Sequence, residues 1–217
     1  MAVGGLTAAS CHGTPDSAMA KRLVDIVGSM MGLVILGIPM LLIAAVIRVS
    51  SRGPALFRQR RAGRGGKPFT LWKFRTMRCD VDPYAHSPHG ADDPRLTRFG
   101  RFLRETSLDE LPQLFNVLAG TMSLVGPRPL YERQAEQWNA DQRRRLDVKP
   151  GITGYAQACG RGSLPIEDKI DMDLHYVDNR SFLMDARILC RTVGNLFRRR
   201  RDVYEERYSR HKEYEDH

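Results

Sequence analysis

Two adjacent carboxylates, Asp109 and Glu110, lie in the stretch RETSLDELPQLFNV (residues 104–117) of a chain that is otherwise strongly basic. A carboxylate can act as a nucleophile, and the free N–H groups at the start of a helix can hold an added phosphate. A second carboxylate beside it can orient a metal ion or the nucleophile. The pair therefore has the groups that phosphoryl transfer requires.

The same pair is compatible with helix capping, which is a structural role. Ser107 and Glu110 have the spacing of a capping box, in which two side chains hydrogen-bond to the backbone of the first turn. Pro112 would then lie inside the helix and remove a hydrogen bond, so it fits better if Asp109 is the N-cap. Capping and catalysis are geometrically compatible, and both interpretations stay open at this point.

Short helices are expected on both sides of the pair. Leu111, Leu114, Phe115 and Leu118 follow the helical spacing, and Gly120 predicts the end of that helix. Upstream, PRLTRFGRFLR (residues 94–104) predicts a second helix with arginines at every third position, which are either solvated or a row of anion-binding groups: Arg95, Arg98, Arg101 and Arg104.

Two apolar runs further upstream predict a small β-hairpin. ALF begins at residue 55 and FTLWKF at residue 69, and the glycines of RRAGRGGKP between them suit a tight connection.

Size and charge bound the class of protein. The 217 residues and 24.6 kDa fit one domain with appendages, and a formal charge of +9 indicates an anionic partner, either nucleic acid, anionic lipid or a phosphorylated substrate. The four scattered cysteines indicate free thiols in a reducing compartment: Cys11, Cys79, Cys159 and Cys190. We interpret His86 and His89 as loop residues rather than metal ligands.

Residues 28–47 form an uncharged apolar run long enough to enter a membrane. Pro39 lies in its second half and predicts a kink or a break. Basic residues flank the run on both sides, so a hairpin that enters and leaves one face satisfies both flanks. A single span with its N-terminus outside is the alternative, and both topologies leave the residues after 48 in the cytoplasm.

At the other end of the chain, an amphipathic helix is predicted. It either lies on anionic headgroups or forms part of the core. Its apolar residues recur at helical spacing: Phe182, Ala186, Leu189, Val193 and Leu196.

Three stretches together resemble the bacterial sugar transferases, and more narrowly the monotopic polyprenyl-phosphate phosphoglycosyl transferases. These are LWKFRTM (71–77), DPRLTRFGRFLRETSLDELPQLFNVLAGTMSLVGPRPL (93–130) and KPGITGYAQACGR (149–161). The resemblance runs from about Lys21 to Phe197. It departs from the family pattern at Thr121, at Tyr155 and in QACGR, which weakens any transfer of substrate identity.

This resemblance implies an α+β, mostly helical fold with a re-entrant membrane segment, a small β-hairpin and amphipathic interfacial helices around the active site. It implies a bacterial inner membrane location with the active site on the cytoplasmic face. Accordingly, we expect a flexible tail at 1–18, the re-entrant segment at 19–50, the catalytic domain at 51–201 and a charged tail at 202–217.

For function, the resemblance implies transfer of a phospho-sugar from a nucleoside diphosphate sugar, usually UDP-linked, to undecaprenyl phosphate, with release of UMP. Asp109 would be the nucleophile that forms a phosphosugar-aspartyl enzyme, and Glu110 would orient the metal or nucleophile or act as a base. Magnesium, held by Asp109 and Glu110 together with substrate phosphates, is the expected cofactor.

Further site residues follow from the same resemblance. Lys73, Arg104 and Arg128 are expected phosphate ligands, and the prolines on either side of Arg128 would hold it in a rigid extended turn. Asp173 and Tyr176 fall in an Asp-x-x-Tyr-Val pattern and are expected at the substrate site. The alternative is a non-catalytic, membrane-anchored basic module that binds anionic lipid or nucleic acid. We prefer the transferase, with no nucleic-acid partner.

Overall fold

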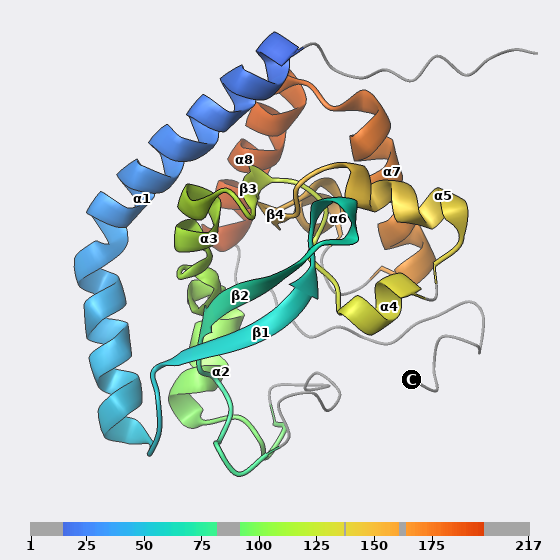
Figure 1. Cartoon of the computed structure of the whole chain (residues 1–217). Helices are drawn as coiled ribbons and strands as arrows, with labels where there is room; N and C mark the ends of the chain where they lie inside the picture. The colour runs from blue at the N-terminus through green and yellow to red at the C-terminus, as the bar shows by residue number, and fades with distance from the viewer. Residues whose placement is uncertain (1–14, 82–91, 137, 161–163, 198–217) are drawn as a thin grey trace, which may run out of the picture.

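The computed structural model describes residues 15–81, 92–136, 138–160 and 164–197, and these form the α+β, mostly helical arrangement shown in Figure 1. One long helix, α1 (Pro15–Ser50), runs along one side of the molecule. A hairpin and a set of short helices make up the rest. The predicted tails, together with Cys11, His86 and His89, lie wholly or largely outside the described residues.

Helix α1 begins at Pro15, inside the tail predicted for residues 1–18, because proline suits the first turn of a helix. It continues through Pro39, so the predicted break does not occur; Figure 1 shows instead that the helix bends near its middle. Its most apolar 18-residue window has a mean hydropathy of 2.7 and only 11% of that window is buried. A helix of this length and composition could cross a membrane, and most of its apolar window is exposed.

The polar N-terminal end of α1 is attached to the rest of the protein. Arg22 donates to the last carbonyls of helix α3, Val117 O at 2.6 Å and Leu118 O at 2.8 Å. Asp25 is only 3% exposed and accepts hydrogen bonds from Ser123 Oγ and Leu124 N, both at 2.9 Å. Arg22 belongs to the basic flank of the apolar run, and together with Asp25 it also holds α1 in place.

The predicted hairpin is confirmed. Strand β1 (Leu56–Ala62) pairs antiparallel with β2 (Pro68–Phe74), and the 3-10 turn η1 (Arg64–Gly66) joins them. A second, parallel pair of strands was not predicted: β3 (Ser123–Val125) and β4 (Gly151–Thr153). A Cβ atom at Gly151 would lie 2.1 Å from Gly126 N, so only glycine permits this approach.

The helix predicted for residues 94–104 is α2 (Arg98–Glu105), which begins later because Thr97 Oγ1 accepts a hydrogen bond from Gly100 N and caps it. Arg95 lies before this helix and pairs with Asp93 at 2.6 Å, so the four arginines do not form one row. The other helical elements are η2 (Leu108–Glu110), α3 (Gln113–Ala119), α4 (Glu132–Glu136), α5 (Ala140–Arg143), η3 (Arg144–Asp147), α6 (Tyr155–Cys159), α7 (Ile166–Asn179) and α8 (Phe182–Phe197).

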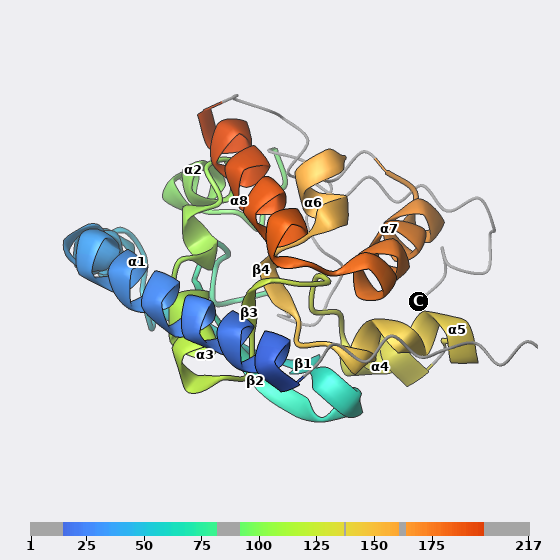
Figure 2. The same ribbon diagram turned by 90° about the horizontal axis from the view of Figure 1, so that it is seen from above.

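Three apolar clusters hold these elements together. The C-terminal half of α1 contributes Met40, Ile43 and Ile47, which pack against Phe74 and Leu103. A second cluster joins β3 to helices α6, α7 and α8, which lie side by side in Figure 2. The third packs β2 on α3, through Leu71, Val117 and Met122.

Helix α8 turns its predicted apolar stripe partly outward. Phe182 and Val193 are exposed, whereas Ile188 and Asn195 on a neighbouring face are buried in the core. Exposed Phe102 of α2 and Phe115 of α3 add to the apolar surface. Helix α8 therefore packs one face in the core and exposes part of its apolar stripe, and contact of that stripe with headgroups stays a prediction.

Candidate active site

The carboxylate pair lies on a tight turn between α2 and α3. Ser107 has a left-handed backbone (φ 57°) and makes no capping hydrogen bond, and the following residues form the 3-10 turn η2. Pro112 occupies the N-cap position of α3, where its missing N–H costs no helical bond. Both capping predictions are therefore wrong: Ser107 and Glu110 form no capping box, and Asp109 is not the N-cap.

Glu110 is held by two cations from distant parts of the chain. Its Oε1 lies 2.8 Å from Lys73 Nζ on β2 and 3.2 Å from Arg128 NH1, in the loop after β3. Burial disfavours the charged carboxylate, but the charges and hydrogen bonds of Lys73 and Arg128 outweigh it and lower the pKa of Glu110 from 4.5 to about 2. Glu110 is therefore ionised at any physiological pH.

Asp109 differs from Glu110 in that no cation in the described part of the chain pairs with it. Its side chain is 6% exposed, and within the described residues it has no hydrogen bond and no ion pair. Burial raises the pKa of Asp109 from 3.8 to about 6; Lys73 opposes the rise and Glu110 adds to it. An unpaired carboxylate that is mostly ionised at neutral pH keeps its oxygen lone pairs available for nucleophilic attack.

A cavity of about 650 Å³ opens in front of the pair, a volume typical of ligand sites. It reaches Gly32 and Leu36 on α1, so the apolar helix contributes to its wall. Six of the seven predicted site residues line it: Lys73, Arg104, Asp109, Glu110, Arg128 and Asp173.

Tyr176, the seventh, does not line the cavity. It is buried in the core beneath β3, with its hydroxyl 2.8 Å from Asp185 Oδ1 and 3.2 Å from Val125 O. Burial raises the pKa of this hydroxyl, so it stays protonated. Because Asp185 also pairs with Lys21 at 2.5 Å, Tyr176 helps to connect α7, α8 and α1.

The structure adds residues that the sequence did not single out. Asn116 is 6% exposed and binds the backbone of β2, accepting from Trp72 N at 3.1 Å and donating to Thr70 O at 2.7 Å. It thereby fixes the strand that carries Lys73, and a polar residue within the apolar pattern of its helix was the available signal. Arg145 also lines the cavity, and no local pattern marks it.

The two carboxylates fit a hard divalent cation in part. Among the described residues no group of three or more metal-ligating side chains occurs. Asp109, however, is unpaired, and magnesium commonly takes one or two carboxylates and completes its shell with substrate phosphates and water. Magnesium is therefore compatible with this donor set, and it remains a prediction.

The fold and the site define a class: an α+β domain that combines a membrane-type apolar helix with a basic cavity around a carboxylate pair. The pattern of the bacterial sugar transferase family matches residues 16–199 of the chain. The chain belongs to this family.

Relatives are consistent with this assignment. EpsL, an uncharacterized sugar transferase of Bacillus subtilis, is 47% identical over 173 residues, 80% of this chain and 85% of that protein. A UDP-glucose:undecaprenyl-phosphate glucose-1-phosphate transferase of Caulobacter vibrioides is 43% identical over 187 residues, 82% and 70% of the two chains. An undecaprenyl-phosphate galactose phosphotransferase of Salmonella typhimurium is 40% identical over 199 residues, 85% and 42% of the two chains.

Several relatives are longer proteins, of which the chain spans less than half: 41%, 38% and 42% of those from Streptococcus agalactiae, Xanthomonas campestris and Salmonella typhimurium. The relatives also differ in the sugar that their names specify, glucose or galactose. Similarity therefore assigns no particular sugar to this chain.

Proposed function

We propose that the protein transfers a sugar phosphate from a nucleoside diphosphate sugar, of the UDP class, to undecaprenyl phosphate and releases UMP. The observation that carries this proposal is the state of Asp109, a buried and unpaired carboxylate in a basic cavity. The names of the relatives from Caulobacter and Salmonella support the same reaction class. A basic module without catalysis would leave the unpaired Asp109 without a role.

In the proposed first step, an oxygen of Asp109 attacks the β-phosphorus, and the bond from this phosphorus to the oxygen bridging the α-phosphate breaks. UMP leaves with that oxygen, and the phosphosugar remains on Asp109. In the second step, a phosphate oxygen of undecaprenyl phosphate attacks the same phosphorus and regenerates the Asp109 carboxylate. Lys73, Arg104 and Arg128 would offset the repulsion among these anions.

Asp109 and Glu110 would hold a magnesium ion, which supplies further positive charge against the phosphates. The ion pairs of Glu110 keep it ionised and fixed next to Asp109. Since its capping role is excluded, Glu110 is left with orienting the metal or the nucleophile, or with acting as a base toward the acceptor.

We further propose that α1 enters and leaves the inner membrane from its cytoplasmic face. At 1.5 Å per residue the helix is about 54 Å long, well beyond the roughly 30 Å of a bilayer core. Both of its ends contact the same domain, through Arg22 and Asp25 at one end and Ile47 at the other. The exposed apolar residues between them, such as Val34 and Ile38, would then face lipid.

The test of activity uses the purified full chain with magnesium, undecaprenyl phosphate and a panel of UDP-sugars, and measures UMP. We expect UMP release with at least one sugar, and none from Asp109→Asn at an unchanged circular dichroism spectrum. Asp92→Asn is the matched control, since the Asp92 side chain is 98% exposed. Undiminished turnover by Asp109→Asn contradicts the covalent mechanism.

The test of topology labels a cysteine placed at Ala18 in intact cells, in a background without Cys11. Protection from an impermeant external reagent is expected for the re-entrant helix. Ready labelling would support a full span instead.

A further inference from the structure

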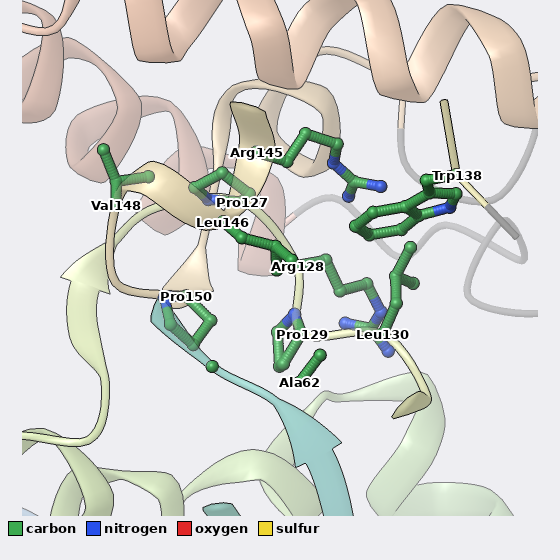
Figure 3. A pocket seen from close by; sticks show the side chains of 11 residues that line it. Ala62, Pro127, Arg128, Pro129, Leu130, Trp138, Arg145, Leu146, Val148 and Pro150 are labelled. Carbon is green, nitrogen blue, oxygen red and sulfur yellow. The ribbon is translucent and has the colours of Figure 1, made fainter. Parts of the chain in front are cut away.

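Arg145 is a buried cation whose hydrogen-bonding capacity is only partly used. It lies on η3, its side chain is 4% exposed, and one of its terminal nitrogens, NH2, pairs with Asp173 on α7. Its guanidinium carbon lies 4.9 Å from the centre of the Trp138 ring. Figure 3 shows these two side chains next to each other, with Arg128 below them in that view.

The remaining nitrogens of Arg145, Nε and NH1, are buried and have no hydrogen-bond partner among the described residues. A guanidinium carries five N–H donors, and a donor that is shielded from water without an acceptor is destabilising. The Trp138 ring offsets part of the charge but supplies no hydrogen-bond acceptor in the plane of the guanidinium. The site is therefore incomplete without an acceptor that the described chain does not provide.

Arg145 lies in the wall of a cavity that can hold a ligand. It lines the large cavity together with Asp173 and Arg128, and it also lines a small hollow of about 10 Å³ that Arg128 shares. That hollow is at the lower limit for one water molecule, whereas the large cavity admits a substrate. Arg128 links the two places, because it also contacts Glu110 at 3.2 Å.

The charges around Arg145 favour an anion. Asp173 is the only carboxylate known to pair with Arg145 in the described residues, and Arg128 also acts electrostatically on Asp173. Basic side chains outnumber carboxylates along the cavity lining. The planar guanidinium of Arg145, with unpartnered N–H donors, binds the oxygens of a phosphate better than it binds a neutral ligand.

We propose that Arg145, positioned by Asp173 and Trp138, binds a substrate phosphate other than the one that reacts with Asp109. Asp173 then serves as a positioning residue, because it pairs with Arg145. The inference rests on the proposed function, because that reaction brings such a phosphate into the cavity from two sources. One is the α-phosphate of the nucleotide, and the other is the phosphate of the lipid acceptor.

The experiment compares Arg145→Gln and Arg145→Lys with Arg144→Gln in the purified full chain. Arg144 is the neighbouring residue on η3 and forms surface ion pairs with Asp141 and with Asp178 on α7, so its substitution by Gln removes the same charge and tests the effect of losing a contact between η3 and α7. Binding of UMP and of inorganic pyrophosphate is measured by calorimetry, KM is measured for the UDP-sugar and for undecaprenyl phosphate, and Tm is recorded for each variant.

We expect Arg145→Gln to weaken phosphate binding or raise one KM by roughly tenfold to a hundredfold, the effect of losing hydrogen bonds to a charged group. Arg145→Lys should retain part of the affinity, because it keeps the charge without the fork, and Arg144→Gln should match the wild type. A change in UMP binding and in KM for the UDP-sugar identifies the nucleotide phosphate. A change confined to KM for undecaprenyl phosphate identifies the lipid phosphate.

A lower Tm with unchanged ligand binding and unchanged KM values in both Arg145 variants overturns the proposal and leaves Arg145 a structural residue. If Arg145→Gln does not fold, the same comparison is made with Arg145→Lys. Failure of the proposed function looks different. The wild type would then release no UMP from any UDP-sugar but would still bind UMP or pyrophosphate, and the Arg145 variants would lose that binding.

Discussion

Asp109 and Asp173 are both buried carboxylates at the same cavity, but their surroundings are reversed. At Asp109 the neighbouring cations bind Glu110, which leaves an unpaired carboxylate. At Asp173 the carboxylate is paired, and the cation Arg145 keeps the unused hydrogen-bonding groups. An unpaired carboxylate suits attack on phosphorus, whereas a paired carboxylate suits holding a cation in place. With the proposed roles of Asp109 and Arg145, the comparison distinguishes a proposed catalytic end of the cavity from a proposed binding end.

The largest expected difference is in turnover. Asp109→Asn should lower kcat by at least roughly a thousandfold, as loss of a nucleophile does in other enzymes. Asp173→Asn should lower kcat/KM by only about tenfold, mainly through KM, because it leaves Arg145 loosely positioned. Steady-state UMP release measures both variants. Equal losses in kcat would remove the distinction between the two ends.

The two variants Asp109→Asn and Asp173→Asn should change the free energy of unfolding in opposite directions. At pH 7.5 with a chelator, Asp109→Asn should raise the free energy of unfolding by up to about 3 kcal/mol, because an amide avoids the cost of a buried, unpaired charge. Asp173→Asn should lower it by about 3 kcal/mol, since Arg145 is left buried without its partner. Urea unfolding measures both changes. A destabilised Asp109→Asn variant would show that Asp109 is paired in solution.

The gain in unfolding free energy of Asp109→Asn over the wild type should depend on pH. The folded-state pKa of about 6 exceeds the ordinary value of 3.8, so the native wild type takes up a proton and gains stability as pH falls through 6. The difference between wild type and variant should therefore shrink between pH 6 and pH 4. Glu110, with a pKa of about 2, adds no change in this range that differs between the two proteins. Urea unfolding at several pH values, without metal, checks this.

The smallest expected effect is at the ring that faces Arg145. Trp138→Leu should raise the KM of the substrate whose phosphate Arg145 binds by about twofold to fivefold, the size of a modest cation–π contribution. Trp138→Phe keeps an aromatic face and should remain closer to the wild type. The kcat of both variants should change little, and a large loss of kcat would place Trp138 at the catalytic end instead.

Elements whose conformation depends on residues close in sequence were predictable from the sequence. The hairpin follows from alternating apolar runs around glycines, and α3 ends at Gly120, where the backbone turns left-handed (φ 85°). The apolar helix follows from an uncharged run of membrane length, although its continuity through Pro39 does not. The parallel pair β3 and β4 was missed, because each strand has three residues and too little pattern to detect.

By itself, the sequence determined the membrane-type helix and the hairpin, and family motifs located six of the residues that line the cavity, since backbone sterics, apolar spacing and motifs are local. Only the tertiary structure decided which charges pair. In the folded protein, Lys73 and Arg128 pair with Glu110 rather than with Asp109, and Arg145 pairs with Asp173. Tyr176 is buried in the core and does not line the cavity. These partners are 18 to 37 residues apart in sequence, and their pairing depends on how separate elements pack. That packing left Asp109 buried, with no hydrogen bond and no ion pair among the described residues.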